Sequence, residues 1–386
     1  MNSEWRAFRL RPHDVLYFGD ARPSKMGEDH YLRSIFPPFP STLYGAIRTR
    51  RLLDEGVNLS GFGKRGDSSI KSAWDRLGTE LRTELGEFGS FGSLELRGPW
   101  LEKDGKPLFP APCDLGFVAE APAATKEVVR YRRVANQKGH WSHSLAPLMP
   151  YRKQAEGWEL IPRSEEPESA AGWFLTHEGM EAWAKGGVPG PGEFFSRDSL
   201  WLDEVRTGVG IEEKKRRAEE HNLFTFGFIR LGRDVTLGFE VRGSALEAGG
   251  ALRLGGDGRT AAIEDGSPLD LPEAITGNSA FTLYFATPTL SEEGAYPPRF
   301  AVDRMRAKLG VGQCTLLAGA VKAGLPCGGF DMRVLEQKAL RRAIPAGSVF
   351  QFEGDPAKLN GANLCGFEEE QFARQGFGLA CVGALR

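Results

Sequence analysis

A polar and basic stretch followed by a helix start, between Phe18 and Arg51, could bind phosphate groups. It reads FGDARPSKMGEDHYLRSIFPPFPSTLYGAIRTRR. The proline cluster at residues 37–40 excludes a regular helix there, because proline fixes φ and lacks an N–H group. A helix is predicted to begin directly afterwards, over 42–53, with Ser41 or Thr42 as its cap. The unpaired N–H groups of a helix N-terminus, together with arginines, make a site that suits phosphates.

The same helix arranges its arginines by face. Three apolar residues share one arc at the helical period: Leu43, Ala46 and Ile47. Arg48 and Arg51 flank this arc. Arg50 falls on its apolar side, where a charged head must reach back to solvent or find an anion. An ordinary loop that leads into an ordinary helix explains these residues as well, so phosphate binding needs support from elsewhere in the chain.

Three glycine-bearing loops and a pair of arginines could contribute further contacts to the same partner. The loops are RTGVG at 206–210, GGDGR at 255–259 and ARQGFGLACVG at 373–383, and Arg341 and Arg342 stand in LRRAIPAGSVFQFEG. Glycine lets a backbone approach a partner closely, and arginines beside a rigid turn can place forked donors on phosphates. Turns, strand ends and a pair of surface bases explain the same residues without any ligand.

Catalytic and metal sites have little support in the sequence. No Ser/His/Asp or Cys/His order, no carboxylate cluster with metal spacing and no phosphate-loop lysine motif is present. His140 and His143 are three residues apart, but further zinc ligands do not follow nearby. The five cysteines are odd in number and widely spaced, so they form neither a disulfide framework nor a zinc pattern. We therefore expect no cofactor and no metal.

The composition is that of a globular protein with one basic face. A length of 386 residues exceeds one typical core and predicts two domains. No apolar run approaches the ~18 residues of a membrane span and no signal pattern opens the chain, so a cytoplasmic protein is expected. A net charge of −2 argues against nucleic-acid binding over the whole surface. Bases nevertheless outnumber acids seven to one between Lys126 and Lys153, and nine to three between Arg299 and Arg342.

Strands separated by few helices are predicted to position these residues. The expected strands cover 5–10, 94–100 (ending at Pro99), 223–231, 235–241, 280–286, 314–321, 327–332, 348–352 and 377–382. A hairpin is predicted at Asp104-Gly105 and a second helix from residue 67 or 68 to Leu85. Residues 113–167 lack a clear period and are expected to be irregular, and the charged run 212–221 to be a solvated helix or mobile loop. This order suggests the βαββαβ plan, used twice.

Five segments in order resemble the third subunit of the Cmr complex. They are DVLYFGDARPSKMGEDHYLRSIFPPFPSTLYGAIRTRRL, RTGVGI, LGGDGR, RRAIPAGSVFQFEG and the terminal GFGLACVG. This subunit family belongs to the type III-B CRISPR effector and to the repeat-associated mysterious protein (RAMP) superfamily. The resemblance touches both ends and the middle of the chain, and residues 60–200 match least.

The resemblance implies an α+β fold of two ferredoxin-like (RRM-like, βαββαβ) RAMP domains with insertions. Residues 1–232 would form the first, with a long insertion around 113–205, and residues 233–386 the second, with a glycine-rich loop. It also implies a non-catalytic subunit for antiviral defence that holds the 5′ handle of the CRISPR RNA. Its protein partners would be the large polymerase/cyclase-like subunit and a backbone RAMP subunit.

The hypothesis for the RNA site combines this resemblance with the residues. Gly376, Gly378 and Gly383 correspond to the superfamily's C-terminal glycine-rich loop, although the third glycine comes only after ACV. The handle is predicted to run along the first helix start and its loop, with charge added from the second half of the chain. The residues assigned to RNA binding are Arg22, Lys25, His30, Ser41, Arg48, Arg259, Arg341, Arg342, Gly376 and Gly378.

Two alternatives remain open. The chain could be a metal-independent endoribonuclease, as some RAMP relatives are, with His13 or His30 as general base. It could also be an interaction scaffold whose contacts are all to protein and whose glycine loops are structural.

Overall fold

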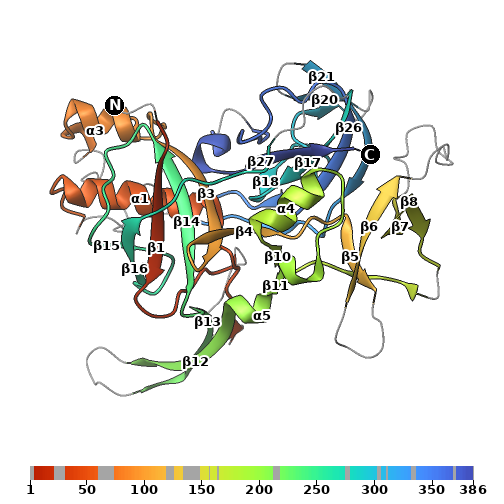
Figure 1. Ribbon diagram of the computed structural model, residues 1–386. Coiled ribbons are helices and arrows are strands. Elements are labelled where there is room, and N and C mark those ends of the chain that lie inside the picture. Colours follow the sequence, from red (N-terminus) through yellow and green to blue (C-terminus); the bar gives the residue numbers. More distant parts are fainter. Residues whose placement is uncertain are drawn as a thin grey trace. The chain divides into compact units, whose positions relative to one another are not determined.

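The structure is a computed structural model that is rich in strands (Figure 1). It describes residues 4–20, 31–59, 74–118, 126–133, 148–155, 157–162, 165–211, 218–273, 279–301, 306–309, 312–331, 336–367 and 371–385. The chain divides into two compact units that are interleaved in sequence. The first comprises Met1–Pro99, Leu200–Pro268 and Pro326–Arg342, and the second Trp100–Ser199, Leu269–Leu325 and Ala343–Arg386. The described residues thus form a mostly β protein with several sheets.

The first unit is built on an antiparallel sheet around its N-terminal strand. Its strands lie in the order β3 (Glu95–Lys103, whose first half belongs to this unit), β14 (Val235–Arg242), β1 (Arg6–Pro12), β16 (Thr260–Asp265) and β15 (Ala251–Arg253). Phe8 lies opposite Phe239 and Leu10 opposite Leu237, and all four side chains are buried. The strands predicted at 5–10 and 235–241 are confirmed.

Helix α1 (Pro40–Asp54) packs against β15 and α3 (Thr79–Leu85). It begins at Pro40, because proline suits the first helical position, where no N–H partner is needed. Phe39 is the cap residue and makes no side-chain cap hydrogen bond, so the predicted cap at Ser41 or Thr42 is wrong. The second predicted helix is not continuous: in its described part, Trp74 and Asp75 are helical, residues 76–78 are not, and α3 then runs from Thr79 to Leu85, the predicted end.

A long hairpin leaves this unit beyond the end of β14 (Figure 1). It consists of β12 (Trp201–Ile211) and β13 (Ala218–Leu231), with β2 (Tyr31–Leu32) parallel to β13. The sequence RTGVG lies inside β12, so the predicted loop there is wrong. A Cβ at Gly208 would lie 2.4 Å from the Phe224 ring, which shows that the glycine makes room for an aromatic ring. Residues 218–221 also form strand, so the predicted helix or loop is wrong for them.

The second unit contains a sheet that is buried on both faces at the strands 280–285, 349–353 and 380–384. Its order is β19 (Phe300–Ala301), β20 (Arg306–Leu309), β21 (Gly312–Ala320), β26 (Val349–Glu353), β17 (Ala280–Phe285) and β27 (Ala380–Ala384). Phe281, Leu283 and Phe285 belong to one core, and Tyr284 belongs to another. A strand buried on both sides reads as a continuous apolar run, which is why AFTLYF was recognisable. Helix α4 (His177–Ala184) covers Tyr284 through Trp183.

Most of the described residues between 113 and 167 belong to a sheet, so the expected irregular region is wrong for them. Its order is β8 (Gly157–Leu160), β7 (Leu148–Gln154), β6 (Glu127–Arg133), β5 (Leu115–Val118) and β9 (Glu168–Ser169). The strands β6 and β7 read EVVRYRR and LMPYRKQ. They mix bases with aromatic rings on both faces, and therefore lack the alternation of apolar and polar residues that identifies a strand in a sequence.

The remaining elements extend these sheets, form small sheets of their own or are short helices. They are β4 (Lys106–Pro110), β10 (Trp173–Leu175), η2 (Pro191–Glu193), β11 (Phe194–Ser196), α5 (Arg197–Leu200), β18 (Thr289–Leu290), β22 (Leu325–Cys327), β23 (Phe330–Asp331), β24 (Glu336–Gln337), β25 (Arg341–Ile344) and η5 (Phe372–Gln375). The hairpin predicted at Asp104-Gly105 joins β3 to β4, and both turn residues have positive φ, 51° and 76°. Strand β3 continues past Pro99, its predicted end.

The strand pairings cross the domain boundary predicted at residue 232. Both β14 and β16 follow that residue, and both pair with β1. A boundary at residue 232 would therefore place β1 in one domain and both of its sheet neighbours in the other. The division into domains at 1–232 and 233–386 stays a prediction.

Candidate nucleic-acid interface

The residues assigned to RNA binding are found in different surroundings. Arg22, Lys25 and His30 lie outside the described residues, as do His140 and His143. Ser41 lies in the first turn of α1, half-buried, and Arg341 and Arg342 begin β25, where Arg342 is exposed. Arg48 and Arg259 contact separate sets of residues, so these two arginines do not act as one group.

Arg48 is held by aromatic rings and a backbone carbonyl. Its guanidinium carbon lies 5.3 Å from the centre of the Trp74 ring and 5.7 Å from that of Phe91. It also donates a hydrogen bond to the Leu85 carbonyl at 3.0 Å. These contacts give Arg48 a packing role between α1 and α3, and its predicted RNA contact stays a prediction.

Arg51, rather than Arg50, occupies the buried side of α1. Arg51 is 7% exposed and donates to Glu84 at 3.0 Å. Burial opposes its charge, but the hydrogen bond from its guanidinium to Glu84 outweighs this effect and raises the pKa of Arg51. Arg50 instead binds Asp54 at 2.6 Å and the carbonyl of Gly249 at 3.1 Å. The predicted need of Arg50 for an anion is therefore met by Asp54, together with backbone carbonyl oxygens.

The root of the β12–β13 hairpin carries a network of six charged side chains that we call the hairpin-root cluster. Its members are Asp14, Glu204, Arg206, Arg230, Asp257 and Arg259. Asp14 accepts from Arg206 at 3.2 Å, Arg230 at 3.0 Å and Arg259 at 3.4 Å. Glu204 accepts from Arg206 at 2.7 Å and from Arg230 through a short hydrogen bond. Asp257 accepts from Arg259 at 2.6 Å.

Aromatic rings line the same face of the hairpin. Arg206 and Arg259 lie over the Phe228 ring, at 5.4 Å and 4.5 Å from its centre. Phe226 precedes Phe228 in β13, with the two ring centres 5.5 Å apart, and the Tyr17 ring packs edge-on against Phe226 at 4.8 Å between centres. Arginine and ring surface thus occur together, as single-stranded nucleic-acid sites require.

The charges of the hairpin-root cluster balance, because it has three arginines and three carboxylates. The hydrogen bond from Arg230 is the main reason that the pKa of Glu204 lies below its usual value. Desolvation opposes the charge of Asp14, but hydrogen bonds from Arg230 and Arg206 outweigh it and lower the pKa of Asp14 as well. Glu204 and Asp14 therefore stay ionised at neutral pH. A phosphate would have to displace them to reach these arginines.

Sequence inspection found only part of this cluster. It singled out Arg259 and the loop that holds Arg206, but not Asp14 or Arg230. Asp14 is 192 residues from Arg206 and 245 from Arg259 in sequence. No pattern within a short stretch of sequence could have predicted that these residues lie together.

The three C-terminal glycines are explained by packing. Gly378 has a φ of +74°, and a Cβ there would lie 1.7 Å from the Leu364 carbonyl oxygen. The Gly376 carbonyl accepts a hydrogen bond from the Thr287 hydroxyl at 2.8 Å. At Gly383 a Cβ would lie 3.1 Å from Cα of Ala184, at the end of α4. Their predicted contact with RNA stays a prediction, since burial alone accounts for all three.

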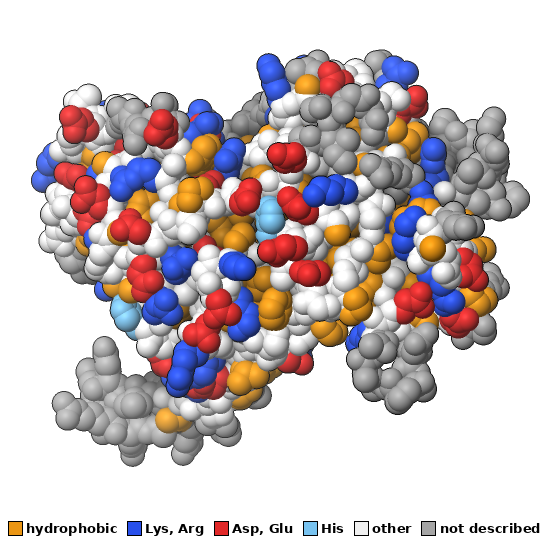
Figure 2. Space-filling model, in the orientation of Figure 1, with side chains coloured by type: hydrophobic (Ala, Val, Ile, Leu, Met, Phe, Trp, Pro, Cys, Tyr) orange, Lys and Arg blue, Asp and Glu red, His pale blue; other side chains and the backbone are white. Residues whose placement is uncertain are grey.

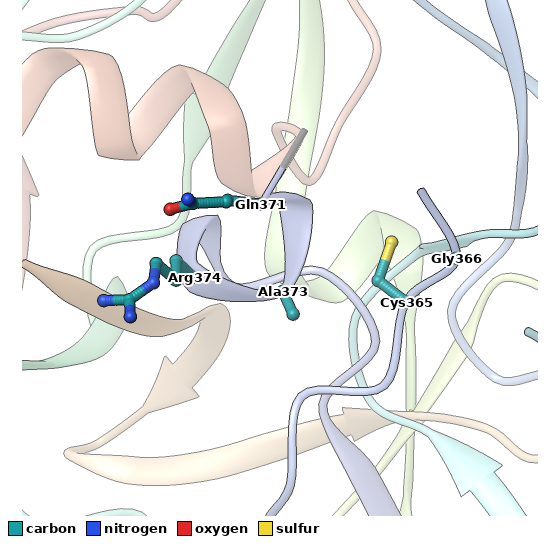
Figure 3. Close-up of a pocket in the computed structure, with 5 residues that line it drawn as sticks. All are labelled: Cys365, Gly366, Gln371, Ala373 and Arg374. Atoms are coloured by element: carbon teal, nitrogen blue, oxygen red, sulfur yellow. The ribbon is translucent and has the colours of Figure 1, made fainter. Parts of the chain in front are cut away.

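A small pocket of about 290 Å³ lies beside this glycine segment (Figure 3). It is lined by Cys365, Gly366, Gln371, Ala373 and Arg374. Gln371 and Arg374 extend from η5 to the same side, and Cys365 lies on a separate segment (Figure 3). Cys365 Sγ donates to the Leu290 carbonyl at 3.8 Å, so the thiol is part of the packing.

Other classes of site find little support in the described part of the chain. Acidic and basic side chains are interspersed on the face drawn in Figure 2. Among the described residues no group of three or more His, Cys, Asp or Glu side chains could hold a metal ion. No helix within the same residues has the length and apolarity needed to cross a membrane.

Comparison with solved structures finds similar chains in CRISPR complexes. One belongs to a cryo-EM structure of the type III-B Cmr-beta complex bound to cognate target RNA and AMPPnP, with 16% identity, 90% of this chain and 86% of that chain covered, and a TM-score of 0.45. A second, of Cmr-beta bound to cognate target RNA, has 15% identity, the same coverage and a TM-score of 0.45. A chain of the Csm3-Csm4 subcomplex of the type III-A interference complex has 11% identity, coverage of 91% and 94%, and a TM-score of 0.33.

Family comparison gives a match over nearly the whole chain. Curated protein sequences give no significant match. The model of the family described as CRISPR-associated protein (Cas_Cmr3) matches residues 8–385. This chain therefore belongs to the Cas_Cmr3 family of CRISPR-associated proteins.

Proposed function

We propose that the chain is a non-catalytic, RNA-binding subunit of a type III-B CRISPR effector in antiviral defence. In this role it holds the 5′ handle of the CRISPR RNA and bridges the large polymerase/cyclase-like subunit to a backbone RAMP subunit. The observation that carries the proposal is the family match over residues 8–385. Two ferredoxin-like RAMP domains and a cytoplasmic location form part of the same proposal.

Several features of the surface agree with an RNA partner. Arg342 is exposed at the start of β25, and Arg259 stands in the turn between β15 and β16 over an aromatic ring. The β12–β13 hairpin presents exposed apolar side chains, Leu202 at 61% and Val205 at 58%. Single-stranded RNA needs basic side chains for its phosphates and aromatic rings for its nucleobases, and exposed aliphatic side chains add apolar contact surface.

Charge reversal at Arg342 tests the placement of the handle. The probe is a labelled RNA with the repeat-derived 5′ handle, and a scrambled RNA of equal length shows whether the sequence matters. Arg342→Glu should weaken handle binding about tenfold and reduce the slope of log affinity against log salt by about 0.7, the loss of one phosphate contact. Lys185→Glu is the matched control, because Lys185 is exposed at the C-terminal cap of α4 and pairs with Glu181 one turn away. Equal affinity of wild type and Arg342→Glu would exclude this placement.

An endoribonuclease remains the alternative, and His13 is its described candidate base. His13 is exposed, and its Nδ1 lies 2.9 Å from the Thr260 hydroxyl. Incubation of the pure protein with repeat RNA in EDTA distinguishes the two functions. We expect intact RNA. Cleavage that is lost in His13→Ala would replace the binding proposal with an enzymatic one.

A further inference from the structure

One face of the sheet of β5–β9 is buried near β5 and carries basic and aromatic side chains toward β8. The register places Arg130 opposite Tyr151 and Arg132 opposite Met149, so these four side chains share a face. Near β5 this face is buried: Arg130 donates to Asp114 at 2.9 Å and to the Trp183 carbonyl at 3.0 Å. These hydrogen bonds fix the β5 end of the sheet to α4 and its core. The strands that continue from there toward β8 are therefore held in a defined position.

Toward β8 the same face carries bases and rings. Lys153 pairs with Trp158 and Tyr151 with Leu160, which adds these residues to the face of Arg132. Lys153 is exposed and Leu160 is 48% exposed. We call this set the basic strand face: Arg132, Tyr151, Lys153, Trp158 and Leu160.

The indole of Trp158 is the centre of the basic strand face. The Arg132 guanidinium carbon lies 4.2 Å from the ring centre, and the Lys153 ammonium lies 5.2 Å from it. A cation at these distances is attracted by the ring and is kept close to it. Two positive charges and a flat apolar surface are therefore presented together at the edge of the sheet.

Acids on these strands lie on the opposite face. Glu127 and Glu159 alternate with the residues of the basic strand face, and Arg152 pairs with Glu127 at 3.2 Å on that opposite side. The described positions of β6, β7 and β8 that share the face of Trp158 include no Asp or Glu. This face thus has a positive charge that its own strands do not balance.

We propose that the basic strand face binds single-stranded RNA, with a base stacked at Trp158 and a backbone phosphate at Lys153. This inference rests on the proposed function, which makes RNA the partner, and adds a site in a region where the family resemblance was weakest. A nucleotide satisfies both features at once, because its base has a flat surface and its phosphate a negative charge. An acidic peptide would satisfy the cations but leave the indole and Leu160 uncovered.

The test compares variants of the full chain in binding a labelled single-stranded RNA of about 12 nucleotides. Trp158→Ala should weaken binding about 5- to 100-fold, the loss of one stacked base, and Trp158→Phe should keep most of it. Lys153→Gln should reduce the salt slope by about 0.7. Arg152→Gln is the matched control: it removes the same charge from the neighbouring residue, on the opposite face, and should leave the slope unchanged. Thermal unfolding of each variant verifies that it is folded.

The outcomes separate this proposal from the proposed function. Equal effects of Lys153→Gln and Arg152→Gln, or unchanged binding in a folded Trp158→Ala, overturn the basic strand face while leaving RNA binding intact. A wild-type chain that binds no RNA overturns both proposals. Binding of a poly-glutamate peptide that is lost in Lys153→Gln, with RNA binding unchanged, would replace RNA by an acidic protein partner.

Discussion

The hairpin-root cluster and the basic strand face both combine basic side chains with aromatic rings, but they differ in the number of carboxylates beside those side chains. At the hairpin root, Asp14, Glu204 and Asp257 accept hydrogen bonds from all three arginines. On the basic strand face, the described strand positions beside Trp158 supply no carboxylate, and Lys153 is exposed. Cation–ring distances are similar in the two regions, 4.5 Å for Arg259 over Phe228 and 4.2 Å for Arg132 over Trp158.

The difference shows that the local charge balance, more than the number of bases, decides what such a region can bind. An arginine that already donates to a carboxylate loses those hydrogen bonds when a phosphate takes their place, so the exchange gains little free energy. Lys153, whose described sheet face carries no acid, can bind a phosphate without giving up a carboxylate on that face. The hairpin-root cluster therefore stabilises the base of a hairpin, and the basic strand face is the better site for a polyanion.

The largest effect is expected at Arg48, whose half-buried guanidinium packs on aromatic rings within the protein. Arg48→Ala removes contacts with the Trp74 and Phe91 rings and a hydrogen bond to Leu85. The free energy of unfolding should fall by about 2 kcal/mol, measured by urea denaturation. Arg11→Ala, which removes an exposed pair with Glu264, should cost under about 0.5 kcal/mol. A loss of RNA affinity without loss of stability would instead support the predicted RNA contact of Arg48.

Removing Asp14 should make the hairpin-root cluster bind RNA more strongly, as we expect of the basic strand face. Asp14→Asn leaves Arg206, Arg230 and Arg259 with one carboxylate fewer. RNA affinity at low salt should rise severalfold and the salt slope should increase by about 0.7, as measured by fluorescence anisotropy. Glu264→Gln makes the same change in net charge beside Arg11 alone. An equal rise in both variants would mean that total charge, and not the cluster, controls binding.

The smallest expected effect is a pH dependence of the unfolding free energy at the hairpin-root cluster, which the basic strand face should not show. The folded-state pKa of Glu204 lies below its usual value, chiefly because of the hydrogen bond from Arg230. Its contribution to stability is therefore fully present above the unfolded pKa and is lost as pH falls through the folded pKa. Wild type should exceed Glu204→Gln in unfolding free energy by under about 1 kcal/mol near pH 6, and this excess should shrink toward about pH 3.

The basic strand face supplies the control for that titration. The stability difference between wild type and Trp158→Ala should stay constant over the same pH range, because no carboxylate shares its strand face among the described positions. A constant difference for Glu204→Gln as well would show that Glu204 acts by packing rather than by charge.

Local chemistry made several elements predictable. Alternation of apolar and polar residues identified β1, the helical period identified α1, and Asp104-Gly105 identified the β3–β4 turn. Each of these signals acts over a few residues, where steric preference and side-chain spacing decide the backbone. The glycine in GGDGR also marked a true turn, in which Gly256 donates to the Tyr17 carbonyl at 2.8 Å.

Tertiary contacts overruled local signals elsewhere. Glycine in RTGVG suggested a loop, but Gly208 makes room in a strand for the ring of Phe224. Basic and aromatic residues concealed β6 and β7, since their faces are distinguished by what packs on them and not by hydrophobicity.

The sequence by itself determined which residues can bind phosphate, and its motifs determined the family resemblance, because residue types and ordered short segments are local properties. Only the tertiary structure decided which bases are already paired: Asp14 meets Arg259 across 245 residues, and Arg51 rather than Arg50 turns to the buried Glu84. The physical reason is that a hydrogen bond depends on distance in space, which strand pairing sets and residue order does not.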